Sequence, residues 1–234
     1  YDDDPLRILR CIRFASRYGW EIEYDTYEGM VRNVSRLEII TKERVKDEFC
    51  KMLTCKHPIM AMELLRKIGA MHYVIPELEE TYSMTQNEYH FGTVWEHTMM
   101  VLEGTKDDNM ILRISALLHD IGKIRVCTEE DGKIHFLKHE LKSGEMIDEL
   151  LRPLKFSNEI IKEVTFLVRN HMICKTWGSE CEYMKDKKLR RFQYECKTEE
   201  RFRNLMTIID ADNNAYAADK CMPKQVELIL RRTE

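Results

Sequence analysis

The feature that most constrains this chain is a set of histidines and aspartates placed on apolar helical stripes. Two stretches follow the i, i+3, i+4, i+7 spacing of one helix face and end in a polar residue: Val164, Leu167, Val168 and His171, and then Leu205, Ile208, Ile209 and Asp212. Each polar side chain therefore continues a core-facing stripe. The pattern predicts an all-α fold in which several helices direct polar groups to one interior point.

Two more histidines lie in the same context. His97 is in phase with Val94 and Val101, and His119 is in phase with Leu112, Ser115 and Ala116. Gly122 predicts a helix stop, so the adjacent His119 and Asp120 lie at a helix end, where neighbouring side chains can converge. Asp210 points to roughly the opposite side of its helix from Asp212, which makes it the weaker ligand candidate.

These residues suggest a metal site. A single histidine on an apolar face is usually a hydrogen-bonded core residue, but a buried ionised aspartate needs a compensating charge, and a cation supplies it. Imidazole and carboxylate together suit magnesium, manganese, iron or nickel, and the absence of clustered thiolates argues against structural zinc. We expect one or two divalent ions. The candidate ligands are His97, His119, Asp120 and Asp212 for the first ion, and His139 and His171, bridged by Asp120, for a second.

These segments resemble the HD superfamily of metal-dependent phosphohydrolases. The resemblance rests on Trp95-Glu96-His97-Thr98, Leu118-His119-Asp120-Ile121-Gly122-Lys123, His139-Glu140, Asn170-His171 and Ala211-Asp212. It implies a helical bundle that hydrolyses phosphomonoesters or phosphodiesters, with Asp120 at the catalytic centre. Lys123 could stabilise a phosphate oxygen. The alternative for Lys123 is an exposed loop lysine.

The N-terminal segment predicts one capped helix. Asp4 is a good N-cap, Pro5 is tolerated at the first helical position, and Gly19 ends the pattern. On a helical wheel one side of this helix is apolar and carries Ile8, Cys11, Ile12, Ala15 and Tyr18. The other side is basic and carries Arg7, Arg10, Arg13 and Arg17. The basic side is either a phosphate-binding face or a solvated one.

This segment resembles the start of the neck domain in class II tRNA nucleotidyltransferases, the CCA-adding enzymes and bacterial poly(A) polymerases, through Asp3-Asp4-Pro5-Leu6-Arg7. The resemblance implies that Asp4 and Arg7 select ATP or CTP in the full-length parent, and that Arg10, Arg13 and Arg17 bind RNA. Glu43-Arg44-Val45-Lys46-Asp47-Glu48 resembles the family motif that braces the neck. Its alternative is a local i, i+4 ion pair between Arg44 and Glu48.

The expected organisation is a neck domain at 1–84, an HD domain at 85–222 and the start of a truncated tail at 223–234. Because no segment resembling the family's catalytic head precedes the neck, we expect a C-terminal part that does not transfer nucleotides alone. The expected partner is tRNA or another RNA 3′ end. Two functions stay open: a phosphohydrolase acting on RNA 3′ ends or 2′,3′-cyclic phosphates, and a non-catalytic tRNA- and nucleotide-binding module.

Composition and charge limit the class of protein and the cellular location that we expect. A net charge of −4 excludes a globally basic RNA-binding surface but permits local patches. No apolar run reaches the roughly 18 residues of a membrane span. The eight cysteines contain no Cys-x-x-Cys pair, and no signal peptide is evident, so we expect reduced thiols and a cytoplasmic location. A second basic run at 185–191 either guides RNA toward the metals or forms a solvated helix.

Overall fold

The computed structural model describes residues 4–87, 92–106 and 108–233, and helices dominate them, as the stripes predict. Asp3 of the predicted template motif and residues 88–91 lie outside the described residues. The α-helices are α1 (Arg7–Tyr18), α2 (Tyr24–Asn33), α3 (Lys42–Leu53), α4 (Pro58–Ile68), α5 (Val94–Gly104), α6 (Met110–Leu118), α7 (Lys123–Val126), α8 (His139–Leu151), α9 (Asn158–Asn170), α10 (Asp186–Glu195), α11 (Glu199–Asn214) and α12 (Gln225–Thr233).

Shorter elements connect the helices. Four segments are 3-10 helices: Val34–Ile39, Ala70–Tyr73, Pro76–Thr81 and Ile173–Trp177. Two short antiparallel strands, β1 (Thr128–Glu130) and β2 (Lys133–His135), form a hairpin in which Glu129 pairs with Ile134. The fold class is thus all-α with one small hairpin.

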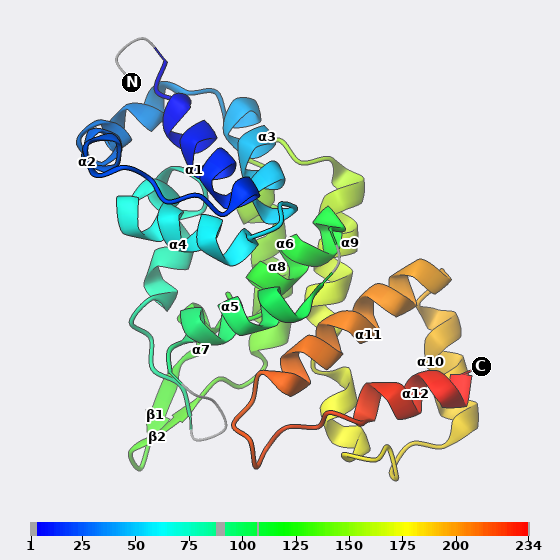
Figure 1. Cartoon of the computed structure of the whole chain (residues 1–234). Helices are drawn as coiled ribbons and strands as arrows, with labels where there is room; N and C mark the ends of the chain where they lie inside the picture. The colour runs from blue at the N-terminus through cyan, green and yellow to red at the C-terminus, as the bar shows by residue number, and fades with distance from the viewer. Residues whose placement is uncertain (1–3, 88–91, 107, 234) are drawn as a thin grey trace.

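Helix α1 packs against α3 and α4 in the N-terminal part of the molecule (Figure 1). The Asp4 carboxylate accepts a hydrogen bond from the Leu6 amide at 3.2 Å, as expected of a capping residue, although the regular helix begins at Arg7. Gly19 ends the helix with a φ of 70°. Tyr18, on the apolar side of the helical wheel, lies in the last turn of the helix and is 50% exposed.

The segment that resembles the neck-bracing motif joins α3 to α1. Glu48 is buried and lies 2.6 Å from Arg13 and 3.8 Å from Arg10, while Arg44 lies 3.4 Å from Asp4. The alternative of a local pair between Arg44 and Glu48 is therefore wrong, since each side chain reaches across to the N-terminal segment. This pairing also ties two arginines of the predicted basic face to a carboxylate.

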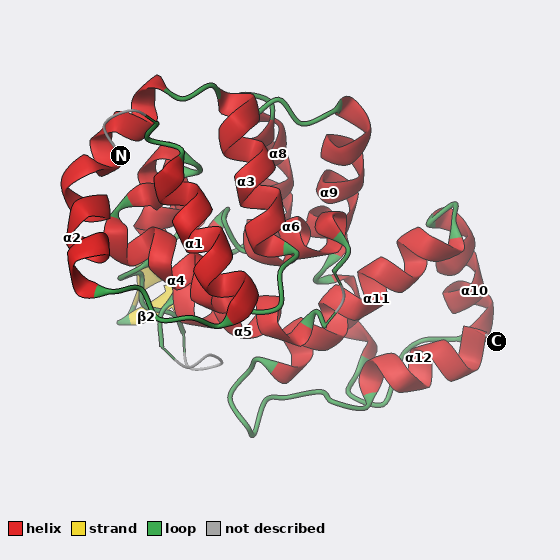
Figure 2. Ribbon diagram, turned by 45° about the horizontal axis from the view of Figure 1, so that its top comes forward, coloured by secondary structure: helices red, strands yellow, loops and turns green. Residues whose placement is uncertain are grey.

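The second predicted domain, at 85–222, is built on α5, α6, α8, α9 and α11. Helix α5 packs on α11 and α6, and α9 packs on α8 and α6 (Figure 2). One buried apolar cluster continues from Leu6 in the neck to Ala215 after α11. The Trp95 indole N–H donates to the Glu63 carboxylate at 2.6 Å and so ties α5 to α4. The two predicted domains thus share a continuous core.

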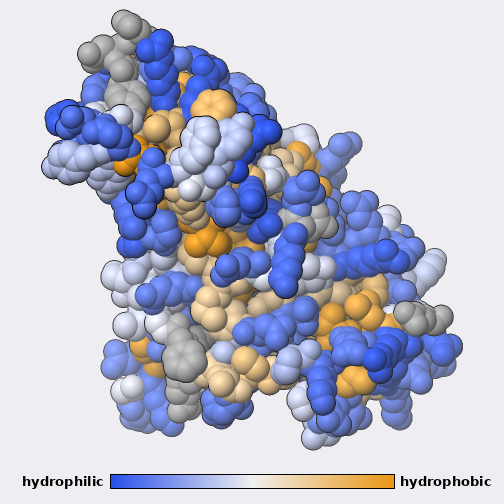
Figure 3. Space-filling model, viewed as in Figure 1, coloured by the Kyte–Doolittle hydropathy of each residue, from blue (hydrophilic) through white to orange (hydrophobic). Residues whose placement is uncertain are grey.

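A second apolar cluster lies among α10, α11 and α12, at the lower right of Figure 1. Val226 and Ile229 of α12 pack there with Phe202, so part of segment 223–234 is a packed helix. The lysines and arginines of the second basic run are exposed, and Arg191 pairs with Glu195 at 2.8 Å. Elsewhere too, hydrophilic residues cover most of the face in Figure 3. These observations favour the solvated interpretation of this run.

Two further expectations concern the state of the cysteines and the length of the apolar helices. All eight cysteines lie among the described residues and are free thiols. Among those residues, the longest apolar helical stretches fall short of what a membrane crossing requires.

Candidate metal centre

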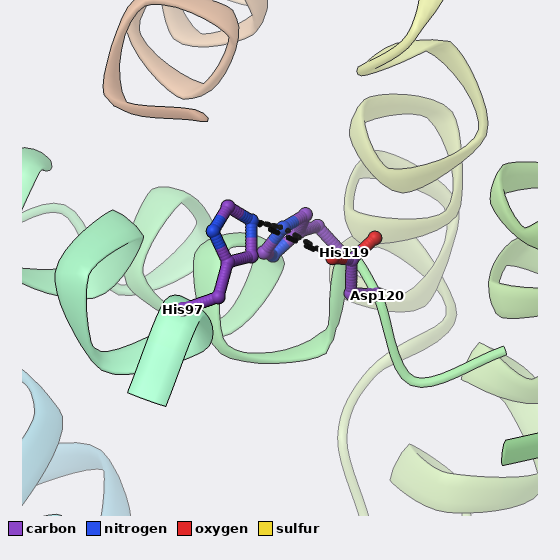
Figure 4. Close-up of side chains that lie close together, drawn as sticks. All are labelled: His97, His119 and Asp120. Carbon is purple, nitrogen blue, oxygen red and sulfur yellow. Dashed lines mark hydrogen bonds and ion pairs between the residues drawn. The ribbon is translucent and has the colours of Figure 1, made fainter. Parts of the chain in front are cut away.

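The six predicted ligands come together in the interior, and most lie at helix ends. His97 belongs to α5, whose start is fixed by a capping box between Thr93 and Glu96. His119 follows the last residue of α6, and Asp120 comes next in the turn. His139 begins α8, His171 follows α9 and Asp212 belongs to α11. All six are buried, and Figure 4 shows His97 and His119 approaching Asp120.

Backbone carbonyls orient all four imidazoles in the same way. The Nδ1 atoms of His97, His119, His139 and His171 lie 3.3, 2.8, 2.9 and 2.7 Å from the carbonyl oxygens of Ala215, Ala116, Phe136 and Val168. A carbonyl only accepts, so Nδ1 carries the proton and donates it. The Nε2 lone pair of each ring is then directed at the carboxylates, which is the tautomer and orientation that metal-binding histidines adopt.

The first ligand group surrounds one oxygen of Asp120. Its Oδ2 lies 3.5 Å from His97 Nε2 and 3.3 Å from His119 Nε2, and the two Nε2 atoms are 3.3 Å apart. Asp212 Oδ1 lies 3.1 Å from His97 Nε2 and 4.0 Å from His119 Nε2. The donor atoms of His97, His119 and Asp120 all fall within 4.8 Å of one another, so one ion could contact these three together, whereas the predicted fourth ligand, Asp212, is not in that cluster.

The second group uses the other oxygen of the same carboxylate. Asp120 Oδ1 lies 3.0 Å from His139 Nε2 and 3.6 Å from His171 Nε2, again within a 4.8 Å cluster. Asp120 thus presents one oxygen to each pair of imidazoles. The donor set and its geometry fit two hard or borderline divalent cations bridged by this residue.

Two lysines supply positive charge beside the carboxylates. Lys123 Nζ lies 2.6 Å from Asp120 Oδ2, and the residue is 2% exposed, so the alternative of an exposed loop lysine is wrong. Lys175 Nζ lies 3.0 Å from Asp212 Oδ2. Lys175 is not among the residues predicted for the site. The one feature of the sequence that could have indicated it is its position one helical turn after His171. Part of the compensating charge that a buried aspartate requires therefore comes from the protein itself.

Electrostatics favour the metal-binding forms of Asp120, Asp212 and His171, whereas at His119 the Asp120 carboxylate outweighs burial and raises the pKa of the imidazole. Burial alone would raise the pKa of Asp120, but His119 and Lys123 outweigh it and hold that pKa well below its usual range. Lys175 and His97 likewise overcome burial and lower the pKa of Asp212. Burial lowers the pKa of His171. The site therefore offers ionised carboxylates together with a neutral His171, as metal binding requires.

A cavity of about 430 Å³ opens over the second group. His139, Lys123 and Lys175 line it, together with the rings of Phe136 and Tyr216. Lys175 Nζ lies 3.8 Å from the centre of the Tyr216 ring. Lys123 Nζ lies 5.2 Å from the centre of the Phe136 ring. Lysine cations beside aromatic rings suit a phosphate ester that carries an apolar or planar group.

Comparison with known proteins agrees with this geometry. A family model described as the HD domain matches residues 87–214, which is more than half of the chain and includes all six candidate ligands. The chain belongs to the HD-domain family. A second family model, described as a probable RNA and SrmB-binding site of polymerase A, matches residues 19–81. The HD region therefore follows a segment with the sequence character of an RNA-binding neck.

The chain is homologous to CCA-adding tRNA nucleotidyltransferases. It is 31% identical over 179 residues to a multifunctional CCA protein of Neisseria gonorrhoeae, covering 74% of this chain and 43% of that protein. It is also 31% identical over 180 residues to a CC-adding tRNA nucleotidyltransferase of Thermus thermophilus, covering 72% of this chain and 42% of that protein. The chain thus spans less than half the length of these relatives.

Solved structures share the fold. The Thermotoga maritima CCA-adding enzyme complexed with tRNA aligns with 99% of this chain and 48% of its own, at a TM-score of 0.60 and 15% identity. A CCA-adding enzyme in complex with ATP aligns with 98% of this chain and 47% of its own, at a TM-score of 0.56 and 16% identity. The helical arrangement described above is therefore that of the corresponding part of these enzymes.

Proposed function

We propose that the HD domain of this chain is a divalent-metal-dependent phosphohydrolase that acts on phosphoesters at RNA 3′ ends, including 2′,3′-cyclic phosphates. The observation that supports this most strongly is the placement of Asp120, which offers one carboxylate oxygen to each of two histidine pairs. A histidine that served only the core would have no need of a second imidazole and a shared carboxylate at its Nε2 atom.

The protein's own groups account for substrate placement. The histidines and aspartates of the two ligand groups would hold divalent ions, which would withdraw charge from phosphoryl oxygens and lower the pKa of a bound water. Lys123 pairs with Asp120 and Lys175 pairs with Asp212, and both lysines line the cavity. Each can donate a hydrogen bond to a phosphoryl oxygen. Burial raises the pKa of Tyr216 well above its usual value, so its hydroxyl stays protonated and can donate as well. The cavity volume of about 430 Å³ suits a ligand the size of a terminal nucleotide.

The test is hydrolysis of 2′,3′-cyclic AMP by the purified chain with added manganese or nickel. Asp120→Ala removes the bridge and should abolish turnover. Asp210→Ala is the matched control, because it removes a half-buried carboxylate from the same helix as Asp212 and from the opposite side. Turnover by wild type and Asp210→Ala, lost in Asp120→Ala, supports the proposal. Absence of turnover with every metal refutes it.

The match of residues 19–81 to an RNA-binding model favours a second role. We propose that the neck binds tRNA and nucleotide in support of terminal nucleotide addition, as the names of the relatives suggest. Arg7 is exposed at the start of α1, next to the Asp4 carboxylate that Arg44 holds in place. ATP binding measured by calorimetry should weaken in Arg7→Ala. An unchanged affinity would remove Arg7 from the nucleotide site.

A further inference from the structure

Three neighbouring cavities form one groove on the side where α1 ends. Their volumes are about 510, 740 and 380 Å³, and Lys56 lines all three. Its lining residues come from the last turns of α1, the turn between α3 and α4, and the turn after α5. It shares no described lining residue with the cavity over the histidines, so it is a separate surface.

The groove is basic in an acidic chain. Among the described residues, six basic ones line it against two acidic ones, Glu103 and Asp108, whereas the whole chain has a net charge of −4. The basic residues are Arg13, Arg17, Lys51, Lys56, Lys106 and Arg113. We refer to this set of lining residues as the basic groove. A local excess of cations on such a chain attracts a polyanion through its backbone charges.

Glu48 offsets part of this charge from below. Its carboxylate lies 2.6 Å from Arg13 and 3.6 Å from Lys51, but the residue is 4% exposed. A ligand in the basic groove therefore contacts the cations and not the carboxylate. Arg17, Lys51, Lys56 and Lys106 are all exposed to solvent.

Three exposed aromatic rings continue the basic groove at the end of α1. Phe14, Tyr18 and Trp20 are 42%, 50% and 59% exposed. The Phe14 and Tyr18 rings are nearly parallel at 6.5 Å, and those of Tyr18 and Trp20 stack at 4.5 Å. Tyr18 also lines the groove, and the Arg17 guanidinium lies 5.6 Å from the centre of its ring.

The backbone holds this stack in place. Gly19 adopts a left-handed conformation, and the Trp20 amide donates to the Ala15 carbonyl at 2.9 Å, which folds Trp20 back against Tyr18. The open face of the stack is therefore organised before any ligand arrives. Large rings that stay exposed, parallel and flanked by arginine are suited to stacking with unpaired bases.

We propose that the basic groove and the Tyr18–Trp20 stack form a binding track for an unpaired RNA segment, with bases on the aromatic rings and phosphates along Lys51, Lys56 and Lys106. Cations alone would accept any polyanion, and duplex RNA hides its base faces from the rings. The combination of the two features is specific to a single strand. The track rests on the RNA-binding role proposed for the neck and adds to it the surface used and the class of RNA bound; it is independent of hydrolysis in the HD domain and of ATP binding at Arg7.

The first test is fluorescence anisotropy with a labelled single-stranded oligoadenylate across a range of potassium chloride concentrations. The variant pair Lys56→Glu with Lys106→Glu should weaken binding at least tenfold and reduce the salt slope by about 1.4, or about 0.7 for each lost phosphate contact. The control pair Lys187→Glu with Lys188→Glu on α10 makes the same change in net charge and should leave affinity near wild type. Equal losses in both pairs would overturn the proposal.

The second test addresses stacking. Trp20 is exposed, whereas Trp95 and Trp177 are buried, so binding of the oligonucleotide should quench the exposed tryptophan emission. Trp20→Ala should weaken single-strand binding by about 5- to 100-fold, with little effect on duplex RNA of the same length. Circular dichroism melts confirm that each variant is folded. If Trp20→Ala binds the single strand as wild type does, the track is wrong.

Discussion

Gly122 sets the distance between the His-Asp turn and α8, and Gly122→Ala should therefore disrupt the second metal group. A Cβ at this position would lie 2.4 Å from the Ser143 nitrogen and 2.5 Å from the His139 carbonyl oxygen. Both are backbone atoms, so no side chain can turn aside. Ordinary contact begins near 3.4 Å, and α8 must move by about 1 Å.

The cost follows from that displacement. Overpacking of a close helix contact destabilises by about 1–3 kcal/mol. The bond from the Gly122 amide to the Ser143 hydroxyl, now 2.8 Å, would also weaken, at about 0.5–1.5 kcal/mol. We expect a loss of about 2–4 kcal/mol in the free energy of unfolding. His139, at the start of α8, would leave Asp120 Oδ1, to which it lies 3.0 Å away.

The assay combines urea denaturation with manganese binding by calorimetry. Gly122→Ala should lose the ion held by Asp120, His139 and His171 and keep the ion held by His97, His119 and Asp120. Gly132→Ala is the control. Gly132 has a left-handed backbone with a φ of 72°, which strains an alanine, but a Cβ at this position would meet no atom within 4 Å. It should cost about 1–2 kcal/mol of backbone strain and leave metal binding intact. Two bound ions and a wild-type urea midpoint in Gly122→Ala would refute the reasoning.

Three further predictions test packing and thiol chemistry. Gln225→Leu removes the three hydrogen bonds that the Gln225 amide makes with Asn213 and with the carbonyls of Cys174 and Gly178, and it should lower the free energy of unfolding by about 2–4 kcal/mol in urea denaturation; a neutral result would show that these bonds do not stabilise the fold. Glu48→Gln should lower the free energy of unfolding by about 1–3 kcal/mol, a range kept small because the Arg13 side chain is 16% exposed. Adding Arg13→Met should recover part of this loss, because the buried arginine then no longer lacks a partner. No recovery in the double variant would argue against the Arg13–Glu48 pair. Burial raises the pKa of Cys196 to about 11, so iodoacetamide at pH 8 should label exposed Cys127 first, and mass spectrometry showing equal rates would contradict that.

Much of the fold could be predicted because local sequence and global packing agree. The stripes that end at His171 and Asp212 place both residues inward, and all the apolar members of those stripes are buried. Asp4 and Gly19 mark the ends of the first helical segment through capping chemistry that operates within a few residues. Such signals depend on helix periodicity and on turns, and both are visible in a single sequence.

The other contacts of the site and of the groove depend on which helices pack against each other. Lys175 contacts Asp212 only because the 3-10 helix Ile173–Trp177 packs beside α11. Arg44 could pair with Glu48 on its own helix or with Asp4, and only the packing of α3 against α1 decides between these two partners. The basic groove draws on residues from α1 to α6, with cations separated by up to a hundred positions. No periodicity connects residues so far apart in the chain.

The central claim is that Asp120 bridges two divalent ions, and the most direct measurement is the number of manganese ions bound per chain. Calorimetry on the metal-depleted protein, checked by elemental analysis after gel filtration, should give two ions for wild type, one for each ligand group. Asp120→Ala should bind at most one ion, weakly, and His139→Ala should retain the ion of the first group. Wild-type protein that binds no manganese, or Asp120→Ala protein that still binds two ions, would contradict the account.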